Sequence, residues 1–333
     1  MTPAYRLTLR RLRRDRLAVG SGVLVAVLLL LVYAGPGVLA RVLGHGPNDP
    51  LPYAVDDNLR PVGPWTRVPA TSNTIPGVAY DKFPHGTKTT LLVLGGDGPL
   101  GRDELLRLLV GGRVSLEVAV GAAAIAIAIG LFAGAVAGYF GGWLDGVISR
   151  FADLVMAFPL LLLLVLVGST VAPQFIDVTL GFLQPGVAAL IVTIGVFTWF
   201  YPARIVRGEI AALKEREFVE SARMIGASEW RILFRHLLPH VVPVLLAYSA
   251  FLIATNVLLE AGVTFLGVGV RLPTASWGNL LATAWGTART PSPFNSSQTT
   301  VWLTVFPSLM IFLTAVSWTL LGESLRRALE PRR

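Results

Sequence analysis

The sequence contains no cysteine and few charged residues. Cysteine is absent from all 333 positions, which excludes disulfide bonds, thiolate metal sites and cysteine nucleophiles. Only 14% of the residues are charged, whereas a soluble domain carries about 25%. The four histidines are scattered and form no metal-binding pattern, so we expect no metal site. Because 53% of the residues are hydrophobic and the mean hydropathy is +0.65, the composition indicates a membrane protein and excludes disordered, coiled-coil and disulfide-scaffold classes.

Six uncharged runs are each long enough to cross a bilayer. A helix needs about 20 mostly apolar residues to span a hydrocarbon core of about 30 Å. The first run follows an arginine-rich segment that resembles the start of a signal peptide, but it exceeds the roughly 7–15 apolar residues of a signal sequence. We therefore predict an all-α membrane protein with an uncleaved first helix. The six transmembrane helices are predicted near residues 17–36, 116–138, 154–172, 185–203, 242–266 and 301–321.

These spans divide the chain into four parts. We predict an Arg-rich N-terminus with the first helix over residues 1–40 and an extended external loop over 41–113. A core of five helices follows over 114–322, including a long polar loop at 204–240, and a tail covers 323–333.

Lysine and arginine are distributed unequally between the two sides of the predicted membrane. Eighteen lie on the side that holds both termini, and ten lie on the other, eight of them in loop 41–113. Long translocated segments count little in the positive-inside rule. We therefore predict that both termini and loop 204–240 are cytoplasmic and that loop 41–113 is external. The N-terminal arginines are expected to contact anionic lipid headgroups.

The external loop 41–113 is rich in turn-forming residues. It holds nine prolines, which favour turns and extended chain over helix. Residues 89–94 could form one short strand. Residues 101–109 combine charges with apolar positions at helical spacing, which predicts an amphipathic helix on the outer membrane interface. Its predicted buried side chains are Leu105, Leu108 and Leu109.

The segment 217–239 contains two short amphipathic patterns. Gly226 lies between them, where the end of a helix requires a positive φ angle. Ser228 suits the N-cap of a second helix, and Pro239 is expected to close the unit before the next span. Two interpretations remain open from periodicity alone: the helices dock into a groove on a soluble partner, or they lie on lipid.

The same segment resembles the EAA loop of bacterial ABC importer permeases. Glu220-Ser221-Ala222 is followed by three residues and Gly226, then by Ile232 and Leu238-Pro239, with Ser221 at the position of the second alanine. The residues that this resemblance implies for coupling to an ATPase are Glu217, Glu220, Ser221, Ala222, Gly226, Ala227, Ser228, Ile232, His236 and Pro239.

Further motifs are similar to the C-type permeases of dipeptide and oligopeptide importers. They include Gly138-Tyr139-Phe140-Gly141-Gly142, Phe158-Pro159, Thr264-Phe265-Leu266-Gly267 and Ser276-Trp277-Gly278-Asn279. The resemblance implies an external or gate segment formed by Gly101, Arg102, Asp103 and Arg113. The chain departs from the family's pattern by one extra residue before Gly101 and a longer segment 41–93. Both departures lie on the face that would meet a binding protein.

The resemblance implies a type I ABC importer permease in a bacterial cytoplasmic membrane. Such a chain pairs with a homologous B-type permease to form a pathway for di- or oligopeptides, nickel or another small solute. Two ATPase subunits, which carry the ATP and magnesium, would dock below the permease pair, and the EAA loop would fit a groove on one of them. An extracytoplasmic binding protein would deliver substrate. The chain itself would bind no cofactor and no nucleic acid.

The residues agree with a chain that does not hydrolyse ATP. A P-loop requires a Gly-Lys pair, and the sequence contains none. It also lacks the GxSxG motif of a serine hydrolase. The alternative class is an ion-gradient-driven transporter, which usually places ionisable groups near the bilayer midplane. The four candidates lie near predicted span ends, where capping or ion pairing explains them: Glu117, Asp145, Asp153 and Glu260.

Overall fold

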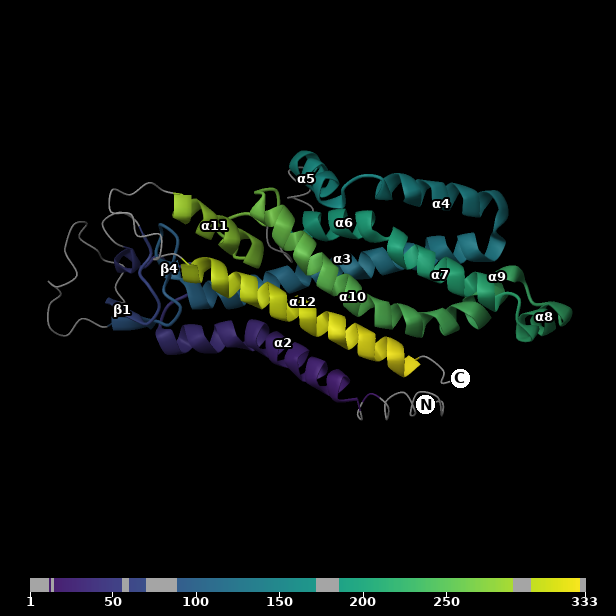
Figure 1. Cartoon of the computed structure of the whole chain (residues 1–333), viewed down its shortest axis with the longest axis horizontal. Helices are drawn as coiled ribbons and strands as arrows, with labels where there is room; N and C mark the ends of the chain where they lie inside the picture. Colours follow the sequence, from purple (N-terminus) through teal and green to yellow (C-terminus); the bar gives the residue numbers. More distant parts are fainter. Residues whose placement is uncertain are drawn as a thin grey trace.

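Long helices run side by side and carry a small β-structure at one end (Figure 1). The computed structural model describes residues 12, 15–55, 60–69, 89–171, 186–289 and 301–329. The helices in these ranges are α2 (Arg16–Leu43), α3 (Glu104–Phe140), α4 (Gly142–Met156), α5 (Leu160–Val171), α6 (Val187–Thr198), α7 (Phe200–Leu213), α8 (Glu217–Met224), α9 (Glu229–Arg231), a π-helical segment (Ile232–Leu237), α10 (Leu238–Phe265), α11 (Trp277–Arg289) and α12 (Val301–Leu329).

Within the described residues, four helices are long and apolar enough to cross a membrane, and two bent pairs bring the total to six. The single helices are α2, α3, α12 and the continuous helix Glu229–Phe265. The pair α4 and α5 bends by 88°, and the pair α6 and α7 bends by 41°. Each of the six predicted spans overlaps one of these units. The predicted helical membrane architecture is therefore confirmed.

The boundaries of several spans differ from the prediction. The third unit begins at Gly142 in α4, and the fourth continues to Leu213, because amphipathic extensions add polar turns to the apolar segments. The second span begins at Glu104, so residues 104–109 form the first turns of α3. The predicted separate interfacial helix at 101–109 is wrong.

Protein contacts explain that error. Leu108 packs in the central core with Val32 of α2 and Trp277 of α11. The indole nitrogen of Trp277 also donates a hydrogen bond to the Leu108 carbonyl at 3.0 Å. The apolar face of this segment is thus covered by helices from distant parts of the sequence, which a local periodicity cannot distinguish from lipid.

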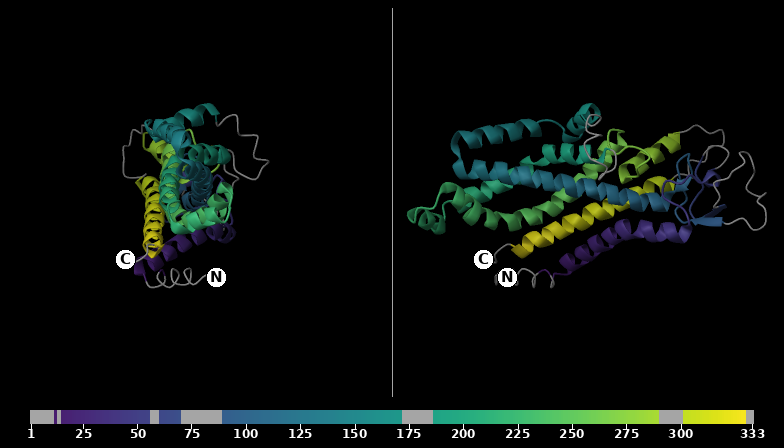
Figure 2. Two further views of the ribbon diagram at one scale, coloured as in Figure 1. Left: turned by 90° about the vertical axis from the view of Figure 1, so that its right-hand side faces the viewer. Right: turned by 180° about the vertical axis from the view of Figure 1, so that it is seen from behind.

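Helix α3 lies at the centre of the bundle (Figures 1 and 2). It contacts α2, α4, α6, α7, α10, α11 and α12. Helix α2 begins and α12 ends on the side where α8 and α9 project, and the β-strands lie at the opposite end (Figure 1). The helical core is therefore organised around one helix that reaches both ends.

Glycines at four-residue spacing let α3 approach α7 closely. A Cβ atom placed on Gly130, Gly134 or Gly138 would lie 2.4–2.8 Å from backbone oxygens of α7 or of the residue before it. Small residues at this spacing allow helix backbones to pack closely in membranes, where association depends on van der Waals contact. The motif therefore fixes α3 and α7 as one unit.

The β-structure consists of two small antiparallel pairs and one 3₁₀ turn, η1 (Pro52–Ala54). Strand β1 (Thr66–Pro69) pairs with β2 (Thr89–Leu92), with Thr66 opposite Leu92. Strand β3 (Gly96–Asp97) pairs with β4 (Arg102–Asp103), immediately before α3. The strand predicted at 89–94 is confirmed over Thr89–Leu92. A small apolar cluster supports it, formed by Leu51, Ala54, Val68 and Leu92.

We predict that Gly134→Ala destabilises the bundle. Its Cβ atom would lie 2.4 Å from the Ala203 carbonyl oxygen, and overpacking of this kind costs about 1–3 kcal/mol. The matched control is Gly146→Ala in α4, where no described atom lies within 4 Å of the added carbon. Melting temperatures of the purified proteins in detergent measure the difference. Equal melting temperatures for the two variants would refute the close α3–α7 contact.

Candidate functional site

Two candidate sites lie at opposite ends of the bundle (Figure 1). The first is the segment for which the EAA resemblance implies a coupling role; we call it the coupling unit and define it as α8, the turn at Gly226, α9 and the π-helical segment. Gly226 has a φ angle of +79°, and the Ser228 hydroxyl accepts a hydrogen bond from the Arg231 amide at 3.4 Å. The predicted glycine turn and serine cap are therefore confirmed. No described atom lies within 4 Å of a Cβ placed on Gly226, so the backbone angle alone demands glycine within this chain.

The inner face of the coupling unit packs on α3 and α7. Val219 and Ala222 of α8 are buried, whereas Phe218 of α8 and Ile225 directly after α8 are exposed. The buried residues of the unit share one apolar cluster with α3, α7 and α10; from the unit itself it includes Val219, Ala222, Ile232, Leu233 and Leu237. The unit is thus held firmly on the membrane core.

The second half of the coupling unit is continuous with the next span. One helix runs from Glu229 to Phe265, so the predicted closure of the unit at Pro239 is wrong. In a regular α-helix the proline ring would clash with the carbonyl four residues earlier. The preceding turn is π-helical, with the Leu238 amide bonded to the Leu233 carbonyl, and this wider turn lets the helix pass through the proline.

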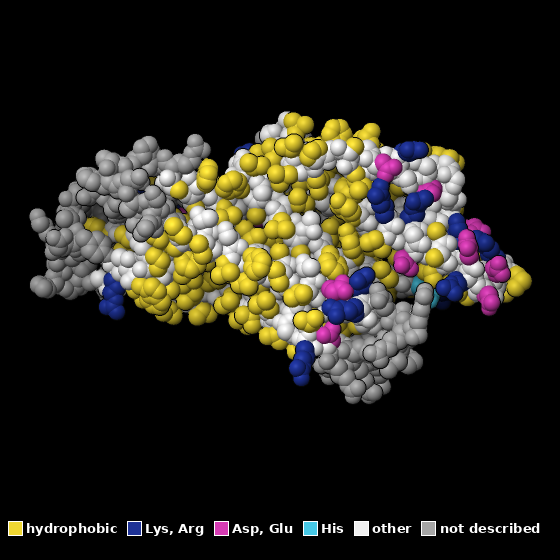
Figure 3. Space-filling view, viewed as in Figure 1, with side chains coloured by type: hydrophobic (Ala, Val, Ile, Leu, Met, Phe, Trp, Pro, Cys, Tyr) yellow, Lys and Arg dark blue, Asp and Glu magenta, His cyan; other side chains and the backbone are white. Residues whose placement is uncertain are grey.

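The outer face of the coupling unit presents apolar side chains. Met224 is 82% exposed and Ile225 is 85% exposed at the turn, and Trp230 and Phe234 are about half exposed beside them. Figure 3 shows hydrophobic atoms at this tip, with acidic and basic side chains around them. The sequence-predicted residues divide by exposure. Glu217, Glu220, Ser221, Ser228 and Pro239 are exposed, Ala227 and His236 are half-buried, and Ala222 and Ile232 are buried.

The second candidate site lies at the end that the charge distribution predicts to be external, and we call it the external charge cluster. It is formed by His45, Asn48, Asp97, Arg102, Asp103 and Arg107. Asp97 contacts the guanidinium groups of Arg102, at 3.1 Å, and of Arg107. Arg107 also donates hydrogen bonds to the Asn48 side chain at 2.7 Å and to the Pro273 carbonyl at 3.3 Å. These contacts connect the segment after α2, the β3–β4 pair, α3 and the segment before α11.

Asp103 connects the external charge cluster to the start of α3. One carboxylate oxygen accepts a hydrogen bond from the Leu106 amide at 3.1 Å, which caps the helix. The other lies 3.0 Å from Nε2 of His45. At Gly101, where φ is +61°, an added Cβ would lie 2.5 Å from the Leu51 carbonyl oxygen. The sequence-predicted Gly101, Arg102 and Asp103 therefore come together here.

Arg113 does not belong to the external charge cluster. It binds Glu117 one turn later on α3 at 2.8 Å and lies over the Tyr33 ring of α2 at 5.6 Å. Conversely, sequence analysis missed the contributions of His45, Asp97 and Arg107. The sequence signal for these residues is an excess of charged residues next to a predicted span. That excess does not indicate which charges pair with each other.

The four acidic residues considered for an ion relay make local interactions. Glu117 binds Arg113, Asp145 binds Arg207 at 2.6 Å, and Asp153 binds Arg204. Glu260 is fully buried and accepts a hydrogen bond from the Thr264 hydroxyl at 2.9 Å. The first three are ion-paired as expected; Glu260 is instead hydrogen-bonded inside the protein.

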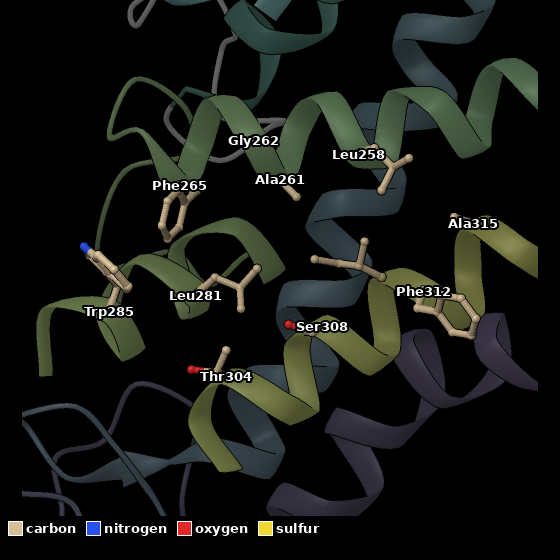
Figure 4. Close-up of a pocket in the computed structure, with 11 residues that line it drawn as sticks. Leu258, Ala261, Gly262, Phe265, Leu281, Trp285, Thr304, Ser308, Phe312 and Ala315 are labelled. Atoms are coloured by element: carbon tan, nitrogen blue, oxygen red, sulfur yellow. The ribbon is translucent and has the colours of Figure 1, made fainter. Parts of the chain in front are cut away.

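A groove of about 610 Å³ lies between α10, α11 and α12 (Figure 4). Phe265 and Leu258 of α10 face it, together with Trp285 of α11 and Phe312 of α12. None of its lining residues is charged. The groove thus offers apolar surface without a group that would bind the charged ends of a peptide. Among the described residues, no group of three or more acidic or histidine side chains could hold a metal ion.

We predict that His45→Gln reduces the pH dependence of stability. The hydrogen bond to Asp103 raises the pKa of His45, which lies outside the spanning helices, above its usual value near 6.5. A raised pKa stabilises the folded state below about pH 6.5, and this stabilisation is lost as pH rises through the folded value. Melting temperature between pH 6 and 8.5 should therefore fall more steeply for the native protein than for His45→Gln. The control is His240→Gln at the opposite end, and parallel curves for His45→Gln and native protein would contradict the prediction.

Comparisons with known proteins agree with this arrangement. The model of the family "Binding-protein-dependent transport system inner membrane component" matches residues 126–333. The model "N-terminal TM domain of oligopeptide transport permease C" matches residues 4–61.

Two relatives illustrate the similarity. The chain is 32% identical over 323 residues to the oligopeptide transport system permease protein OppC of Escherichia coli (strain K12), covering 97% of this chain and 89% of OppC. It is 39% identical over 233 residues to the glutathione transport system permease protein GsiD of Escherichia coli O6:K15:H31, covering 70% of each chain. These relatives are permease subunits rather than enzymes. The chain therefore belongs to the binding-protein-dependent transport system inner membrane components, as a multi-pass ABC transporter permease of the oligopeptide C type.

Proposed function

We propose that this permease couples ATP hydrolysis on separate ATPase subunits to import of di- or oligopeptides, and that the coupling unit is its ATPase-docking element. The exposed apolar tip carries this proposal. Met224 and Ile225 stand in solvent beside half-exposed Trp230 and Phe234, although burial of apolar surface yields about 25 cal/mol per Å². A groove on an ATPase subunit would bury these side chains.

Charge around the tip argues against the lipid-bound alternative. Glu217 and Glu220 are exposed on α8, and Glu229 is exposed at the start of α9. The cytoplasmic leaflet of a bilayer is negatively charged and attracts basic segments. Exposed Arg223, Arg231 and Arg235 balance these three glutamates, so the coupling unit has no net positive charge that would hold it on an anionic membrane surface, which favours a protein groove.

Tight packing of the coupling unit would make such docking useful. Because Val219, Ala222 and Leu237 are buried against α3 and α7, movement of a docked ATPase would move these helices as well. Rigid-body rotation of one permease half against its partner is a common way to alternate access. We infer that a homologous B-type permease supplies the other half and that a binding protein docks at the external end.

The substrate class follows from the relatives' names. OppC is named for oligopeptides and GsiD for glutathione, so a peptide is proposed here. Nickel or another small solute is the alternative. Uptake of a labelled tripeptide, compared with labelled nickel, by vesicles containing the complete transporter and its binding protein distinguishes the two.

We predict that Gly226→Val weakens association with the ATPase subunits. A β-branched residue at φ +79° costs about 1–3 kcal/mol and would distort the turn that presents Met224 and Ile225. Co-purification of the ATPase subunits and ATP-driven uptake should both fall roughly tenfold, the factor that corresponds to about 1.4 kcal/mol. The same two measurements on Glu220→Lys test the contribution of an exposed acidic side chain near the tip.

The matched control for this experiment is Gly208→Val. Gly208 lies in α7, has no described atom within 4 Å of an added Cβ and does not have a positive φ angle. Native ATPase association and native uptake in Gly226→Val would contradict docking at this tip.

We also propose that the coupling unit is cytoplasmic and the β-structure external. Because the chain lacks cysteine, single cysteines can report on each side. Arg67 of β1 and Ser221 of α8 are both exposed. An impermeant maleimide added to spheroplasts should label Arg67→Cys and spare Ser221→Cys until the membrane is permeabilised; the reverse labelling would invert the topology.

A further inference from the structure

The last turn of α3 has no role in the proposals above, although it carries the sequence Gly138-Tyr139-Phe140. Tyr139 is only 7% exposed. Its hydroxyl contacts the Glu229 carboxylate at the start of α9. This is a direct polar contact between the central helix of the bundle and the coupling unit.

The same carboxylate also meets α8. Arg223 places a guanidinium nitrogen 3.7 Å from Glu229 Oε2, across the turn at Gly226. Glu229 therefore connects three elements at one point, because α8 supplies Arg223 and α3 supplies Tyr139. The two short helices of the coupling unit are tied to each other and to α3 through one acidic side chain.

Aromatic rings form a second connection beside the first. Phe140 meets Trp230 edge to face, with ring centroids 5.3 Å apart. Trp230 stacks on Phe234 at 5.7 Å. Two glycines with positive φ, Gly141 and Gly142, follow directly and turn the chain into α4. Tyr139 and Phe140 are thus the final side chains of α3, and both contact residues at the start of α9.

The chemistry of these contacts differs from that of the surrounding interface. Apart from Tyr139, whose hydroxyl also interacts with Arg223 of α8, the buried contact between the coupling unit and α3–α7 is apolar, which is favourable but not directional. A hydrogen bond to a carboxylate is directional and stronger than a neutral one. Tyr139 is buried and its hydroxyl contact is part-buried, so rotation of the unit on α3 would separate the hydroxyl from Glu229, which is itself about half exposed.

We propose that Tyr139 and Glu229 form a coupling latch, a positioning pair that makes the coupling unit and α3 move as one body. The latch does not bind substrate or nucleotide. It determines how much of the movement of the ATPase subunits reaches the membrane helices. This inference rests on the proposed docking of ATPase subunits at the coupling unit.

The test uses the complete transporter with its binding protein in vesicles, with uptake of the transported peptide per ATP hydrolysed as the readout. Tyr139→Phe keeps the aromatic ring and removes only the hydroxyl, and Glu229→Ala removes the acceptor. Each should lower uptake per ATP by roughly tenfold, as expected for loss of a hydrogen bond to a charged group. The double variant should be no worse than Glu229→Ala alone, because Glu229→Ala already removes the acceptor of the Tyr139 hydroxyl together with the contact to Arg223.

The control variant is Tyr201→Phe, since Tyr201 of α7 is 42% exposed and its hydroxyl makes no comparable contact with the coupling unit among the described residues. Co-purified ATPase should remain at the native level in Tyr139→Phe, because the exposed tip is unchanged. This measurement separates the latch from the docking proposal. If Tyr139→Phe lost association with the ATPase subunits although the tip is unaltered, Tyr139 would have a purely structural role and the latch proposal would be overturned.

Two further outcomes would also overturn the latch. One is native uptake per ATP in Tyr139→Phe, and the other is additive losses in the double variant. If one of the single variants does not assemble, the other single variant, compared with Tyr201→Phe, decides the question. Docking itself is judged separately by Gly226→Val, so failure of the latch leaves the docking proposal standing.

Discussion

The close contact between α3 and α7 is the constraint on which both ends of this protein depend. Gly134 brings α3 against the α7 backbone, and Gly138 does the same one turn later. The outer end of α3 begins in the external charge cluster, and its inner end contacts the coupling unit. A change in the position of α3 would therefore alter the contacts at both sites. In the bilayer this contact depends on shape, because lipid tails are as apolar as the helices themselves.

The two ends of α3 are fixed by different chemistry. At the external end, Asp97 pairs with Arg102 and Arg107 away from water, so removal of one partner would leave a buried charge. At the other end, apolar packing is supplemented by polar contacts of Tyr139 with Glu229 and Arg223 of the coupling unit. The external contacts hold the β-structure on the bundle. The inner contacts leave an apolar tip free for the proposed ATPase subunits.

The continuous helix Glu229–Phe265 changes how the coupling unit is understood. The sequence pattern predicts two short helices closed by Pro239 before the next span. The π-helical segment instead carries the helix through the proline, so α9 is the end of a transmembrane helix. A force on Trp230 or Phe234 would therefore act on α10 directly, and on α3 through the proposed latch.

The helical membrane class, the turn at Gly226 and the cap at Ser228 all follow from the amino-acid sequence. Each is a matter of local physics: apolar length decides membrane insertion, and a positive φ angle or an orphan amide selects glycine or serine. The family resemblance at Glu220, Ala222 and Gly226 is likewise carried by a short stretch of chain. These features involve residues that are neighbours in the sequence.

The pairing of charges and the covering of apolar faces by protein depend instead on the tertiary fold. Leu108 has the same periodicity whether lipid or Trp277 covers it, and only the fold brings α11 there. Likewise, nothing local connects Tyr139 with Glu229, or His45 with Asp103, because they are 90 and 58 residues apart. Such contacts depend on how the helices pack in three dimensions. That packing is set by the shapes of surfaces distant in sequence, such as the glycine face of α3 against α7.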